Sequence, residues 1–64
     1  MDKTLANEIL DKLKNKELHE YVVTKDVFYP FRDALVQRSD FKHFRGIAGQ
    51  GGTVVYEYME VPRS

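Results

Sequence analysis

The 64-residue sequence carries ten Lys and Arg against ten Asp and Glu, so its formal net charge is zero at pH 7. This balance argues against a protein that binds nucleic acid through bulk positive charge, and the length leaves room for one modest hydrophobic core but not for a nucleotide-binding α/β domain or a barrel. The absence of cysteine excludes disulfides, thiolate metal sites and thiol catalysis. We expect residues 1–64 to form a single domain. We also expect a cytoplasmic location, because no apolar run approaches the ~20 residues that span a membrane and the N-terminus lacks the apolar stretch of a signal peptide.

Apolar residues recur at helical spacing near the N-terminus, while charged residues occupy the positions between them. The apolar positions that share one helix face are Leu5, Ile9, Leu10 and Leu13. Asp2 or Thr4 can accept hydrogen bonds from the free amides of the first turn. The pattern predicts a helix from about residue 4 to residue 17.

A short strand and a second helix are predicted next. Residues 21–24 are β-branched or aromatic, which is typical of a strand. Thr24 and Asp26 are good caps for a helix over residues 27–37, and Pro30 falls near its start, where a missing amide costs least. The apolar face of this helix would consist of Val27, Phe31, Ala34 and Leu35.

The second helix is expected to break after residue 37. At 100° per residue, an unbroken helix would place Arg38, Lys42 and Arg45 on its buried face, at a cost of several kcal/mol. Ser39 and Asp40 favour turns and mark the break. Since Phe41 and Phe44 are three residues apart, the pattern favours a short third helix that presents both rings on one face.

The C-terminal part predicts a β-hairpin. Four glycines lie between residues 46 and 52, and residues 53–61 carry the strongest strand signal of the chain. The first arm would run over residues 45–48, and Pro62 would end the second arm. The expected fold class is therefore α+β, in the order helix, short strand, helix, short helix and C-terminal hairpin.

This order and the lengths of the elements resemble the winged-helix branch of the helix-turn-helix proteins, over most of the chain. The resemblance implies that the third helix enters the major groove of DNA and that the hairpin, or wing, touches the neighbouring phosphate backbone.

Positive charge concentrates in the middle of the chain. Residues 21–45 carry five Lys and Arg against three Asp, and within the stretch from residue 38 onward Arg38, Lys42, His43 and Arg45 face only Asp40. The Lys and Arg side chains can neutralise duplex phosphates, and Gln37, Ser39 or His43 can reach base edges. The glycine-rich turn around Gln50 can approach a phosphate closely. The same charges would also serve as the solvated outer face of a small helix, or as a charged protein interface.

The aromatic residues offer a second kind of surface. Most Phe residues match apolar helix faces and are expected in the core. Tyr56 and Tyr58 share one face of the last strand and are better candidates for exposure, as part of a partner or dimer surface.

Metal binding and catalysis are not expected. His19 and His43 are 24 residues apart without carboxylates at metal-ligand spacing, and the glycine turn is not followed by the Lys-Ser/Thr of a phosphate-binding loop. We expect neither a cofactor nor an enzyme.

Two hypotheses follow. The first is a small DNA-binding regulatory or accessory protein, of the kind found in phages and plasmids, that binds double-stranded DNA in transcription regulation through Arg38, Lys42, His43, Arg45 and Gln50. The alternative is a protein-interaction module, an inhibitor or adaptor, that docks through Tyr56, Tyr58 and the edge of the hairpin, or that forms a homodimer.

Overall fold

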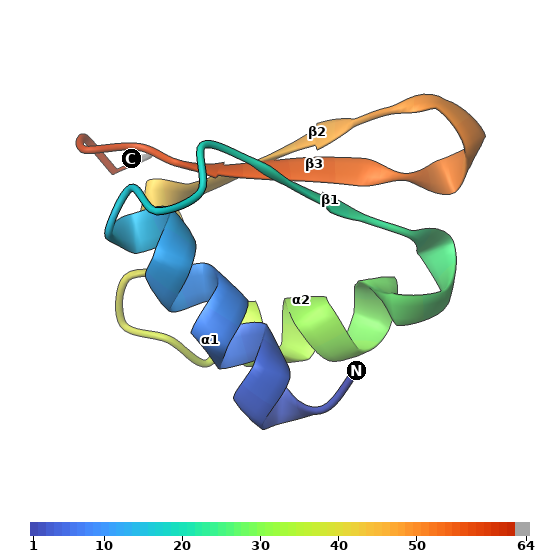
Figure 1. Cartoon of the computed structure of the whole chain (residues 1–64), viewed down its shortest axis with the longest axis horizontal. Coiled ribbons are helices and arrows are strands. Elements are labelled where there is room, and N and C mark those ends of the chain that lie inside the picture. Colours follow the sequence, from blue (N-terminus) through green and yellow to red (C-terminus); the bar gives the residue numbers. More distant parts are fainter. Residues whose placement is uncertain (63–64) are drawn as a thin grey trace.

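The computed structural model describes residues 1–62, in which two α-helices lie on one side of a three-stranded antiparallel sheet (Figure 1). The helices are α1 (Lys3–Lys14) and α2 (Phe28–Val36), and the strands are β1 (Tyr21–Val23), β2 (Phe44–Ala48) and β3 (Val54–Tyr58). Single 3₁₀ turns precede α2, β2 and β3, at Lys25–Val27, Phe41–His43 and Gln50–Gly52. The expected α+β class is confirmed.

The sequence of α1 determines both of its ends. The Asp2 side chain accepts a hydrogen bond from the Leu5 amide at 2.8 Å and caps the first turn. Asn15 caps the other end, and Lys16 turns the chain away with a positive φ of 66°, so the helix stops three residues before the predicted end. Ile9, Leu10 and Leu13 are buried as predicted, but Ala6 takes the place expected for Leu5, which is 46% exposed.

The segment after α2 differs from the prediction in one respect. The helix begins with Pro30 in its first turn and ends at Val36, before Ser39 and Asp40, as predicted. The predicted third helix is only one 3₁₀ turn, and Phe44 already belongs to β2, where it pairs with Tyr58. Phe44 reaches the core from a strand, so it does not share a helix face with Phe41.

The last strand, β3, lies in the centre of the sheet, between β1 and β2. Tyr56 pairs with Tyr21 on one side and with Gly46 on the other, which places these three residues on the face toward the helices. Because side chains alternate along a strand, Val55 and its cross-strand partners Val22 and Ile47 lie on the opposite, outer face.

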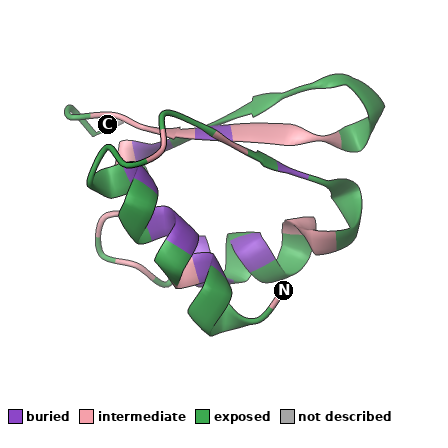
Figure 2. Ribbon diagram, in the orientation of Figure 1, coloured by how far each residue is buried: buried purple, intermediate pink, exposed green. Residues whose placement is uncertain are grey.

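Figure 2 shows the buried residues between the helices and the sheet. Phe31 of α2 is fully buried, with its ring centroid 5.0 Å from that of Tyr56 and 5.9 Å from that of Tyr21. Tyr56 is only 6% exposed, so the expectation that it is exposed is wrong. A Cβ atom at Gly46 would lie 3.0 Å from Cε1 of Tyr56, which explains why a glycine stands beside this ring.

Replacing Phe31 by Leu should lower the free energy of unfolding by about 1–2 kcal/mol, because the smaller side chain leaves a void between the two tyrosines. Tyr29→Leu is the matched control on the same helix, since Tyr29 is 74% exposed and should tolerate the change within about 0.5 kcal/mol. Urea denaturation of both variants measures the difference. Equal losses would contradict this assignment of the core.

Candidate functional site

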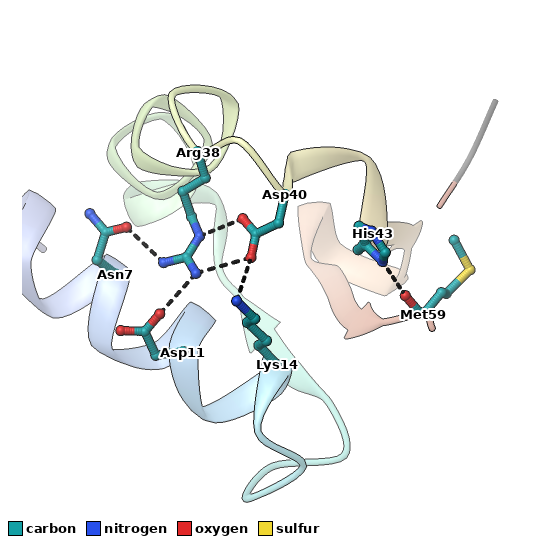
Figure 3. Close-up of polar contacts among 7 residues, drawn as sticks. All are labelled: Asn7, Asp11, Lys14, Arg38, Asp40, His43 and Met59. Carbon is teal, nitrogen blue, oxygen red and sulfur yellow. Dashed lines mark hydrogen bonds and ion pairs between the residues drawn. The ribbon is translucent and has the colours of Figure 1, made fainter. Parts of the chain in front are cut away.

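Arg38, the first of the predicted basic residues, connects α1 to the turn that follows α2. Its Nε and Nη2 donate to the two carboxylate oxygens of Asp40 at 2.9 and 3.2 Å, Nη1 donates to Asn7 at 2.9 Å, and Nη2 also donates to Asp11 at 2.8 Å. Figure 3 shows the guanidinium enclosed by these groups, which come from α1 and from the turn after α2. The Arg38 side chain is only 15% exposed, and its guanidinium lies 5.7 Å from the centroid of the Phe44 ring.

These contacts change the electrostatics of both partners. The hydrogen bonds from Arg38 hold the pKa of Asp40 below its ordinary value of 3.8, and Lys14 adds to this effect with its ammonium 3.9 Å from the carboxylate. The hydrogen bond to Asp40 raises the pKa of Arg38. The guanidinium is therefore a structural cation, with few donors left for a phosphate.

His43 is also engaged within the protein. Its Nδ1 lies 2.8 Å from the carbonyl oxygen of Met59, which can only accept, so Nδ1 carries the proton in this contact (Figure 3). The imidazole stacks on Tyr58 with 5.1 Å between ring centroids. Tyr58 is half-buried, and its ring also contacts Phe44 at a centroid separation of 5.2 Å.

The remaining predicted nucleic-acid residues do not form one cluster. Lys42 is exposed in the 3₁₀ turn before β2, whereas Arg45 lies on the outer face of the sheet and pairs with Glu57 at 3.7 Å. Gln50 lies at the tip of the hairpin, beyond the far end of β2. At about 3.3 Å per residue, the five residues of β2 alone place about 16 Å between Lys42 and Gln50.

A groove lies between β2 and α2, with a volume of about 410 Å³. Most of the residues that line it have apolar or aromatic side chains, and the lining consists of Phe28, Arg32, Leu35, Val36, Phe41, Phe44, Gly46, Ala48, Val54 and Tyr56. This size falls within the range of about 300–1,000 Å³ that is typical of binding pockets. Tyr56, one of the two tyrosines predicted to contact a partner, thus lines the groove from within the core.

Sequence reasoning missed Arg32 and this groove. Arg32 forms neither a hydrogen bond nor an ion pair with any residue in the described range 1–62. Its position on α2, one residue from buried Phe31 and three from buried Leu35, was a signal that it lies at the border of the apolar face. The groove beside Arg32 could not be predicted from this pattern, because it also depends on the position of β2.

Among residues 1–62, no group of three or more His, Cys, Asp or Glu side chains is placed to hold a metal ion. Within the same residues, neither helix is both long and apolar enough to cross a membrane.

Replacing Arg38 by Met should lower the free energy of unfolding by about 2 kcal/mol, because the charged hydrogen bonds to Asp40 and Asp11 are lost. The control is Arg45→Met, which removes an exposed ion pair worth less than about 1 kcal/mol. Chemical denaturation of both variants tests the difference. If Arg45→Met costs as much, Arg38 has no special role in the fold.

Stability should depend on pH through Asp40. Because its folded pKa lies below its unfolded value, its contribution is complete above the unfolded pKa and is lost as the pH falls through the folded pKa. Between about pH 5 and pH 2, unfolding free energy should therefore fall more steeply for the wild type than for Asp40→Asn. Parallel curves over this range would contradict the role of Asp40.

Comparison with curated proteins and with solved structures gives no match. The family described as YkzS-like protein matches residues 3–57, from the first residue of α1 to the penultimate residue of β3. The match gives no support to the winged-helix resemblance. Because it covers both helices and almost the whole sheet, the chain belongs to the YkzS-like protein family.

Proposed function

We propose that the protein is a small protein-interaction module that docks a partner through its C-terminal hairpin, at the groove between β2 and α2. The groove itself carries this proposal, because it is the place where apolar side chains of the hairpin and of a helix open together to solvent. Val36, at its border, is 44% exposed. Apolar surface of this kind, bordered by polar residues, is typical of interaction sites.

The positions of the basic residues favour a protein partner over DNA. Arg38 and His43 are engaged in contacts within the protein, and Arg45 has Glu57 beside it. The turn Phe41–His43 is too short to act as the recognition helix that the winged-helix resemblance implies. DNA contact through Lys42, Arg45 and Gln50 stays a prediction, and it is the second arm of the test.

A photoreactive benzoylphenylalanine at Val36 should form discrete adducts with a partner protein in cells, because this position borders the groove. The same group at Glu8, which is exposed on α1, is the control and should give none of them. Ala48→Lys places a charge in the groove and should abolish the adducts, whereas Lys42→Glu lies outside the groove and should leave them unchanged. Identical adducts from Val36 and Glu8 would contradict the proposal.

The DNA arm uses the labelled protein and a generic duplex at low salt. We expect no NMR shifts at residues 38–50. Shifts there that disappear between about 50 and 200 mM salt would favour DNA binding instead, because phosphate contacts are strongly salt-dependent.

A further inference from the structure

We propose that the partner is bound as an added β-strand: an extended segment pairs with the free edge of β2, places alternate apolar side chains in the groove, and presents a carboxylate to Arg32. This inference rests on the proposed function and specifies its mode of recognition. It depends on three observations: the direction of the free backbone groups of β2, the lack of protection along that edge, and the unpaired cation beside the groove.

The hydrogen bonds at the two ends of the hairpin determine which backbone groups of β2 are free. The Gly49 amide donates to the Thr53 carbonyl at 2.8 Å, and the Met59 amide donates to the His43 carbonyl at 2.7 Å. In an antiparallel ladder, hydrogen-bonded pairs alternate with non-bonded pairs, so the intervening odd-numbered residues of β2 point their N–H and C=O groups toward β3. The N–H and C=O groups of Gly46 and Ala48 therefore point away from β3, toward the open edge, whereas the Phe44 N–H donates to the Phe41 carbonyl in the preceding turn.

The free edge of β2 lacks the usual protection against pairing. Proteins shield edge strands with Lys, Pro, bulges or a covering segment. The sequence of β2 contains neither Lys nor Pro, and its one charged residue, Arg45, faces Glu57 on the outer side of the sheet. In the part of the chain that the structure describes, no strand pairs with this edge.

The groove lies directly beside these free groups. Gly46 and Ala48, the two residues with outward backbone groups, also line the groove, together with Leu35 and Val36 of α2. Since side chains of a strand alternate between two faces, residues i and i+2 of an added strand would point into the groove, while the residue between them would face water. Gly46 and Ala48 leave room for them, because neither carries a bulky side chain.

Arg32 indicates the charge of the segment. It lines the groove from α2 and forms no ion pair within residues 1–62, in contrast to Arg38 and Arg45. A carboxylate is the natural complement of a guanidinium, in two parallel hydrogen bonds. A second copy of β2 supplies no such group, because Phe-Arg-Gly-Ile-Ala contains no acidic residue. A partner segment with Asp or Glu therefore fits this groove better than a second copy.

The test uses decapeptides selected from a random displayed library by binding to the full chain, followed by NMR of the ¹⁵N-labelled protein. We expect the selected peptides to share apolar residues at i and i+2 and one Asp or Glu. The amide protons of Gly46 and Ala48 should shift downfield and exchange more slowly on binding. Those of Arg45 and Ile47, which already face β3, should change little.

Two pairs of variants separate strand pairing from general contact. Ala48→Pro removes one outward N–H and should weaken binding at least about tenfold, whereas Ala48→Ser keeps this group and should not. Arg32→Glu should weaken binding of the acidic peptide about tenfold and should favour a peptide in which Lys replaces the acidic residue. Lys42→Glu, the control outside the groove, should change neither affinity.

Three results would overturn the proposal. The first is a selection that yields no binder. The second is a binder that leaves the amides of Gly46 and Ala48 unchanged; if the adducts from Val36 persist, the proposed function still stands. The third is a shift of these amides with protein concentration alone, which would identify a second copy as the occupant.

Discussion

The Arg38 guanidinium is the contact on which the arrangement of the elements depends. It lies just after the end of α2. It donates hydrogen bonds both to α1, through Asn7 and Asp11, and to its own turn, through Asp40 (Figure 3). It also packs beside Phe44, the first residue of β2. One side chain thus connects the end of α2 with α1 and with the first residue of the hairpin.

Two short helices cover only one face of the sheet, and this limit determines which parts of the hairpin meet water. The register aligns Val22, Val55 and Ile47 in one row across the outer face, and Val22 and Ile47 are exposed there. Beside this row, Arg45 and Glu57 form a polar cross-strand pair. The edge of β2 has no comparable polar protection, although hydrogen-bonding groups there need a partner or water. The proposed added strand would supply that partner.

The elements that depend on local pattern were predictable from the sequence, whereas the site depended on tertiary contacts. Helix periodicity, the Asp2 cap and the break after α2 follow from local chemistry and are confirmed. The exposure of Tyr56 was predicted wrongly, because both faces of β3 carry apolar residues and only the packing of Phe31 shows which face is inside. The cost of burying a charge predicts that Arg38 lies outside the interior, but the structure buries most of this side chain, because carboxylates that the helix phase could not identify satisfy its guanidinium.

The position of β3 in the middle of the sheet has a consequence for the order of folding. Both edge strands precede it in the chain, and each pairs with β3 alone, with Tyr21 and Tyr56 in register across 35 residues. During synthesis, β1 and β2 therefore remain without a hydrogen-bonding partner until Val54–Tyr58 has left the ribosome. Until then the helices can form locally, but the closure of the long loop between β1 and β3 must wait. The sheet therefore cannot assemble before β3 is available.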